Sequence, residues 1–112
     1  QTAARDAAKN WNAVVALKGA TTFIASPDGE MWRHDGCSAG LAVSGSGDVL
    51  AGIIAGLAAR GATLEQATAW GILLHAQAGQ RLAQRIGSLG YLAREIADEV
   101  PALLDRLARR AD

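Results

Sequence analysis

The chain has 112 residues, enough for one domain and too few for two ordinary ones. Half of the residues are hydrophobic, so a buried core can form, and 11 lysines and arginines balance 11 aspartates and glutamates. With a net charge of zero there is no field of one sign to attract nucleic acid or an anionic membrane, and we expect neither as a partner.

The single cysteine, Cys37, excludes an internal disulfide and fits a reducing compartment. The longest strongly apolar run, residues 49–59, is much shorter than the roughly 20 residues of a membrane span. We therefore expect a cytoplasmic protein. We also expect no metal site. His34 and Cys37 could be two ligands, but the only other histidine or cysteine in the sequence is His75, and a metal–sulfur site needs more ligands than these.

The first third of the chain predicts a helix followed by strands. Residues 1–10 are alanine-rich with exposed charges, which is typical of a helix. Residues 13–17 form a continuous apolar run with two β-branched side chains, typical of a parallel strand covered on both faces. Strands at 21–25 and 30–33 are predicted to be joined by a turn at residues 27–29, where proline presets φ and glycine accepts a positive φ.

The rest of the chain predicts helices. The first covers residues 48–60, and Gly52 and Gly56, four residues apart, predict a close approach of this helix to a neighbouring element. The next begins with a capping box in which Thr63 and Gln66 satisfy each other's backbone amides. On this helix His75 and Trp70 lie on or beside the apolar face, where packing is a more common role than catalysis.

Two boundaries are predicted near the carboxyl end. Gly87 and Ser88 are expected to close the long helix and cap the next one. Pro101 is expected to stop that helix and to start a last amphipathic one.

The apolar strand at 13–17 also bears on domain organisation. It needs neighbours on both sides, whereas the sequence supplies only the hairpin, and a parallel strand requires a preceding βα unit. We therefore interpret residues 1–112 as the C-terminal part of a single larger α/β domain, with the N-terminal part absent from this sequence.

The first candidate corner of a functional site is the run Lys18-Gly19-Ala20-Thr21-Thr22 after the apolar strand. In open α/β sheets, ligands collect where strand ends meet helix starts. The lysine ammonium, the glycine amide and the two hydroxyls could together contact a phosphate. Alternatively, the lysine is a solvated residue at a strand end.

The second corner is the glycine row, residues 44–48, at the start of the predicted helix. The backbone amides of Gly45, Ser46 and Gly47 have little side chain around them, and the helix dipole adds positive potential, so the row suits an anion. Asp48 at its end has two possible roles: a helix cap worth about 1 kcal/mol, or a general base.

Taken in this order, the runs 14–22, 26–29 and 44–52 resemble the ADP/ATP-dependent NAD(P)H-hydrate dehydratases, nicotinamide-nucleotide repair enzymes with a ribokinase-like fold. Further similarity lies in 74–79 and 87–101. The glycine–aspartate motif is shared by many ribokinase-like sugar and vitamin kinases. The lysine-glycine-alanine-threonine run and the helix motifs favour the dehydratases. The loop at 37–43 departs from the family's usual sequence.

The resemblance implies a ribokinase-like three-layer α/β fold, of which this chain holds the C-terminal segment: a buried strand, a β-hairpin and a run of helices. It implies a catalytic Asp48 that also contacts the substrate, hydrated NADH or NADPH. It implies ADP or ATP as co-substrate, carrying Mg²⁺, and a homo-oligomer. The residues implied to bind the nucleotide are Lys18, Gly19, Ala20, Thr21, Thr22 and Gly47.

Two alternatives stay open on the sequence. A ribokinase-like kinase of a small hydroxylated metabolite or vitamin precursor would accumulate a phosphorylated product. A truncated, non-catalytic domain would bind no nucleotide even in the complete protein. In the dehydratase interpretation, the 112 residues alone are not expected to be a competent enzyme.

Overall fold

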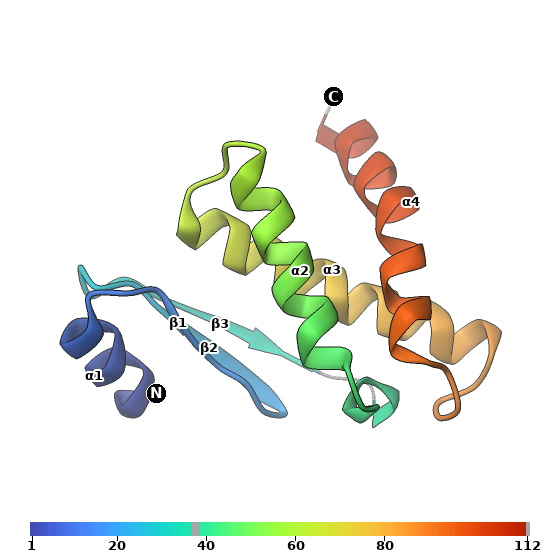
Figure 1. Ribbon diagram of the computed structural model, residues 1–112, viewed down its shortest axis with the longest axis horizontal. Helices are drawn as coiled ribbons and strands as arrows, with labels where there is room; N and C mark the ends of the chain where they lie inside the picture. The colour runs from blue at the N-terminus through green and yellow to red at the C-terminus, as the bar shows by residue number, and fades with distance from the viewer. Residues whose placement is uncertain (37–38, 112) are drawn as a thin grey trace.

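The computed structural model describes residues 1–36 and 39–111 (Figure 1). One helix is followed by three strands, a short 3₁₀ helix and three further helices. In chain order the elements are α1 (Thr2–Trp11), β1 (Val15–Leu17), β2 (Thr21–Ala25), β3 (Met31–Asp35), η1 (Ala39–Ala42), α2 (Ser46–Ala59), α3 (Leu64–Arg85) and α4 (Ala93–Ala111).

The sheet is antiparallel, with strand order β1-β2-β3. Val15 pairs with Ala25 in the first ladder, and Ala25 pairs with Met31 in the second. Within the described part of the chain β1 pairs with β2 alone, and the parallel partner predicted for residues 13–17, which was expected outside this sequence, stays a prediction. Sequence does not separate the two cases, because an apolar run requires coverage of both faces and not a direction of pairing.

The sheet is the middle of three layers, as Figure 1 shows. Side chains alternate along a strand, so Phe23 and Ala25 face the opposite side from Ile24. On the first side they pack with Ala4 and Ala8 of α1. On the other side Ile24 packs with Leu50 of α2 and Ile72 of α3. The three-layer α/β architecture expected from the sequence is thus present, with the sheet covered on both faces.

The hairpin between β2 and β3 is closed by the predicted turn. The Ser26 N–H donates to the Glu30 carbonyl at 2.9 Å, and Gly29 has a φ of 99°. The carboxylate of Asp28 accepts from the Glu30 N–H at 3.0 Å, which fixes the turn from its side chain. β3 then runs to Asp35, two residues beyond its predicted end.

α2 begins at Ser46, two residues before its predicted start, and Gly45 is its N-cap with a φ of 89°. The predicted close approach at Gly52 and Gly56 is wrong, because a Cβ at either position would meet nothing within 4 Å. The close approach lies on the facing helix instead, where a Cβ at Gly71 of α3 would lie 2.5 Å from Ile54 Cγ1.

α3 begins as predicted. The Gln66 N–H donates to Thr63 Oγ1 at 3.1 Å, and the Thr63 N–H donates to Gln66 Oε1 at 3.3 Å, which completes the capping box.

α4 differs from the prediction at both boundaries. Ser88 does not cap it; the Leu92 N–H, just before the helix, donates to Glu95 Oε1 at 2.8 Å instead. Pro101 lies inside the helix and does not stop it. A proline removes one helical hydrogen bond. Here the helix continues because Ile96 and Leu103, on either side of the proline, are buried in one core cluster, and this packing outweighs the lost bond.

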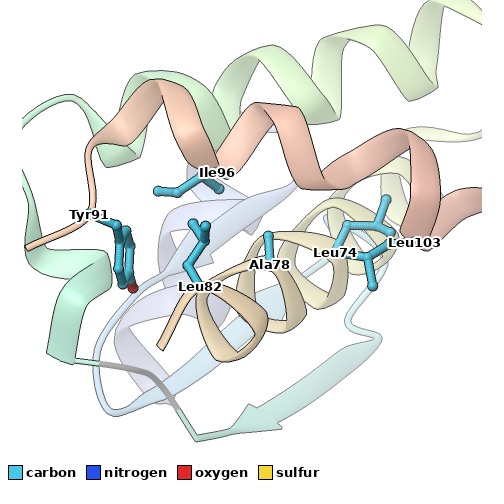
Figure 2. Close-up of a cluster of buried hydrophobic side chains, with 6 residues drawn as sticks. All are labelled: Leu74, Ala78, Leu82, Tyr91, Ile96 and Leu103. Atoms are coloured by element: carbon cyan, nitrogen blue, oxygen red, sulfur yellow. The ribbon is translucent and has the colours of Figure 1, made fainter. Parts of the chain in front are cut away.

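That cluster joins α3 to α4 and to the segment before α2 (Figure 2). Its buried members are Leu74, Ala78, Leu82, Tyr91, Ile96 and Leu103. Beside it the buried carboxylate of Glu99 accepts from Arg85 Nη1 at 2.7 Å, which connects α4 to α3. Gly40 of η1 lies so close to the Tyr91 ring that a Cβ there would overlap it. In the described ranges, no helix has both the length and the apolar character needed to cross a membrane.

Candidate functional site

The glycine row leads directly into the first turn of α2. Gly45 is the N-cap, and Ser46, Gly47 and Asp48 are the first three helical residues. Among the residues that the structure describes, no side chain caps this helix, so the interpretation of Asp48 as a cap is wrong. Asp48 is exposed, and a carboxylate in the first turn interacts favourably with the helix dipole. Its carboxylate is therefore accessible at the surface.

The three amides predicted to bind an anion are not equivalent. The Ser46 N–H donates to the Val43 carbonyl at 3.1 Å, so this amide already has a partner. Gly47 is exposed, and a Cβ there would meet nothing within 4 Å, so the space beside its backbone is open. Of the predicted row, Gly45 and Gly47 remain as candidates for anion contacts, with Gly47 adjacent to Asp48.

Ser46 makes a contact beneath the row that the sequence did not predict. Its side chain is buried, and Ser46 Oγ lies 2.9 Å from Nε2 of the buried His75, in the middle of α3. The same ring nitrogen lies 3.2 Å from the Ser46 carbonyl oxygen. His75 is buried, as predicted for a packing residue, but its polar partner is the first residue of α2.

The ring of His75 is held in its neutral form. Burial, first, and then the positive charge of Lys18 lower the pKa of His75 below its ordinary value. The charge of Lys18, at the end of β1, thus acts on the histidine beneath the glycine row. Lys18 is itself exposed, which leaves its ammonium open to a ligand.

The threonines of the first corner are divided between the two faces of the sheet. Thr22 is buried and has the same strand parity as Ile24, so it faces the helix layer. Thr21 has the opposite parity, and its hydroxyl donates to Asp35 Oδ1 at 3.0 Å. Hydrogen bonds from Arg33, at 2.9 Å, and from Thr21 lower the pKa of Asp35. The Thr21 hydroxyl is therefore engaged within the sheet.

The remaining predicted residues lie in the link between β1 and β2. Gly19 and Ala20 are exposed, and the Ala20 carbonyl accepts from the Gly36 N–H at 3.2 Å. Cys37, considered above as a metal ligand with His34, lies outside the described residues. Over residues 1–36 and 39–111, no group of three or more histidine, cysteine, aspartate or glutamate side chains could hold a metal ion.

Known proteins share this sequence and arrangement. Residues 1–102 match a protein-family model described as NAD(P)H-hydrate dehydratase. The chain is 57% identical over 102 residues to the ADP-dependent (S)-NAD(P)H-hydrate dehydratase of Xanthomonas campestris, covering 91% of this chain and 35% of that protein. It is 42% identical over 105 residues to the bifunctional NAD(P)H-hydrate repair enzyme of Moorella thermoacetica, covering 94% and 20%.

A solved structure matches as well. The ADP/ATP-dependent NAD(P)H-hydrate dehydratase from Bacillus subtilis, crystallised with ATP and Mg²⁺, superposes with a TM-score of 0.87 at 30% identity. The match covers 94% of this chain and 38% of that one. Together with the three layers, it identifies the fold as carbohydrate-kinase-like, that is, ribokinase-like.

The chain belongs to the NAD(P)H-hydrate dehydratase family, as the resemblance in the sequence implied. It spans about a third of the length of the Xanthomonas relative and a fifth of the bifunctional enzyme from Moorella.

Proposed function

We propose that the complete protein to which this chain contributes is a nucleotide-dependent NAD(P)H-hydrate dehydratase, a lyase that restores NAD(P)H from its hydrate. The observation that carries the proposal is the exposed Asp48 in the first turn of α2, beside the open backbone of Gly47. A base and an anion-binding amide next to each other are what transfer of a phosphoryl group to a hydroxyl requires.

In this proposal the carboxylate of Asp48 takes the proton from the hydroxyl of the hydrate. The hydroxyl oxygen then attacks the terminal phosphorus of ADP or ATP. The bond between that phosphorus and the bridging oxygen of the nucleotide breaks. The C–O bond of the phosphorylated substrate then breaks, phosphate leaves with that oxygen, and the neighbouring carbon loses a proton as the double bond forms; the products are NAD(P)H, phosphate and AMP or ADP. The Gly47 amide, and that of Gly45, stabilise negative charge on the phosphoryl group as it moves.

The first corner is assigned to the nucleotide. Lys18 supplies a positive charge from an exposed position, with the amides of Gly19 and Ala20 beside it. Thr22 faces the helix layer, whereas the Thr21 hydroxyl is occupied by Asp35, so a Thr21 contact would use its backbone. Mg²⁺, carried by the nucleotide, would neutralise phosphate charge.

The same proposal covers the domain, the location and the assembly of the complete protein. Residues 1–112 form the C-terminal part of one ribokinase-like domain, in a cytoplasmic protein that assembles as a homo-oligomer. The balance of charges on the chain supports a small-molecule enzyme without nucleic-acid or membrane partners.

The proposal is tested in the complete protein with Asp48→Asn. The amide keeps the size of the side chain but cannot accept the proton, so turnover should fall by about 10²–10⁴-fold. Nucleotide affinity should change less than about threefold, because the backbone amides remain. Recovery of NADH absorbance from the hydrate measures turnover, and calorimetric titration with ADP and ATP measures affinity.

Full turnover in Asp48→Asn would remove the catalytic assignment. If the unaltered protein instead accumulates a phosphorylated product and recovers no NADH, the kinase alternative replaces the dehydratase. If it binds no nucleotide, the non-catalytic alternative does so.

A further inference from the structure

The start of α2 is intrinsically poorly fixed. Its N-cap is Gly45, its second residue is Gly47, and no side chain caps it. Glycine loses more conformational freedom on folding than any other residue, and an uncapped first turn frays easily. Yet the catalysis proposed for Asp48 requires its carboxylate to be held in one place, because small displacements of a base cost large factors in rate.

His75 provides an attachment from below. Its Nε2 lies within hydrogen-bond distance of two atoms of Ser46, the hydroxyl at 2.9 Å and the carbonyl oxygen at 3.2 Å. A contact to both the side chain and the main chain of one residue restrains the rotation of the turn as well as its position. Both residues are buried, so water does not compete for these bonds.

Ser46 and Asp48 lie on opposite sides of the helix. Two residues along an α-helix correspond to a rotation of about 200°. The Ser46 side chain is accordingly buried against α3, whereas Asp48 is exposed. A bond that holds Ser46 inward therefore sets the direction in which Asp48 points outward.

The helix that carries His75 is a firm support. α3 begins with a complete capping box, and its Leu74 and Ala78 are fully buried in the core cluster. One turn before His75, Gly71 allows the close approach of Ile54 from α2. The Ser46 carbonyl oxygen can only accept, so both contacts form together when the proton of the neutral ring is on Nε2 and donates to the carbonyl and hydroxyl oxygens.

We propose that His75 is a positioning residue, which anchors Ser46 and thereby fixes the first turn of α2, with Asp48 and the Gly47 amide, in its reactive geometry. The inference rests on the proposed function for the role of Asp48. The anchor itself does not depend on which reaction is catalysed.

The anchor is tested first without substrate, by amide hydrogen exchange in the complete protein. In His75→Leu and in the milder Ser46→Ala, the amides of residues 46 and 49, which donate to the carbonyls of Val43 and Gly45, should exchange at least about tenfold faster than in the parent. Thr68→Val is the matched control. It removes a buried hydroxyl of the same helix, which donates to the Leu64 carbonyl within α3 at 2.7 Å. Exchange of the amides of residues 46 and 49 should not change in this control.

Turnover then tests positioning. His75→Leu should lower kcat by about 10–100-fold with a smaller change in KM, and His75→Gln, whose amide can donate and accept, should recover most of the loss. In the Asp48→Asn background, His75→Leu should cost less than about twofold, because the group that it positions is gone. Thr68→Val should retain the kcat of the parent.

Unchanged exchange of the amides of residues 46 and 49 in folded Ser46→Ala and in folded His75→Leu would overturn the anchor. Multiplicative losses of His75→Leu and Asp48→Asn, or an equal loss in Thr68→Val, would overturn positioning. If the parent has no activity on the hydrate but exchange is still faster in His75→Leu than in the parent, the proposed function is overturned while the anchor stands.

Discussion

At the scale of single residues, Asp48 of the candidate site is predictable from the sequence, whereas the polar role of His75 is not. Asp48 is recognisable because an acid ends a row of small residues at a helix start. His75 is not, because its position on an apolar helix face is the same for a packing residue and for a hydrogen-bonding one. A usable signal was Ser46: a hydroxyl one residue past the N-cap, on the inner face of a helix, must find a partner.

The buried state of His75 makes the stability of the protein depend on pH. Its pKa is lowered in the folded protein, by burial first and by the charge of Lys18 second, whereas in the unfolded chain it stays near the ordinary value of about 6.5. Between these two values the unfolded chain binds more protons, so the free energy of unfolding decreases as the pH falls below about 6.5. Above that pH both states are neutral, and His75 contributes no dependence.

Urea unfolding of the complete protein at pH 7.5, 6.5 and 5.5 measures this dependence. We expect the loss of stability between pH 6.5 and 5.5 to be smaller in His75→Gln than in the parent, with Thr68→Val behaving as the parent does. Equal slopes in the parent and in His75→Gln would mean that the histidine is not kept neutral by the fold.

At the scale of elements, local signals were reliable where short-range chemistry decides. The turn at 27–29 and the capping box of α3 depend on residues within three or four positions of each other, and both are confirmed. Boundaries decided by packing were missed. Pro101 lies within α4, where its neighbours are buried, and α2 starts at Ser46, whose buried side chain contacts His75 of α3.

The contact between α2 and α3 gives a test at this scale. In Gly71→Ala the new Cβ would lie 2.5 Å from Ile54 Cγ1, so the two helices must move apart. Overpacking of this kind costs about 1–3 kcal/mol, against a gain of roughly 1 kcal/mol in helix propensity. We expect a net loss of unfolding free energy, measured with urea.

The matched experiment is the same substitution in an Ile54→Ala background, where the overlapping atom is absent. There Gly71→Ala should be neutral or stabilising. Additive losses in the double variant would show that the close approach is not what position 71 requires.

At the scale of the whole molecule, the class of fold was readable from the alternation of one apolar strand, a hairpin and helices. The direction of strand pairing was not, because β1 carries the composition of a strand covered on both faces whichever way it pairs. In the described part of the chain β1 has one paired edge, and Leu17 at its end is 44% exposed. Such an edge is open to a further strand.

We therefore predict that the 112 residues, purified by themselves, do not turn over the hydrate and tend to associate. Exposed apolar side chains and the open edge of β1 favour association, and the chain spans 35% of the Xanthomonas relative, so most of a substrate pocket would come from elsewhere. Light scattering and the NADH assay, run beside the complete protein, measure both properties. A monomeric, cooperatively unfolding and active 112-residue chain would contradict the prediction.

Gly40 lies three residues ahead of Val43 and contacts the Tyr91 ring. This contact connects the loop before the site to the segment before α4. Any side chain at position 40 collides with that ring, so the two positions cannot drift independently over evolutionary time. A larger residue at 40 becomes viable only with a smaller one at 91, and the change would also remove the largest side chain of the core cluster. Evolution of the loop ahead of the glycine row is thus constrained by the carboxyl-terminal third of the chain.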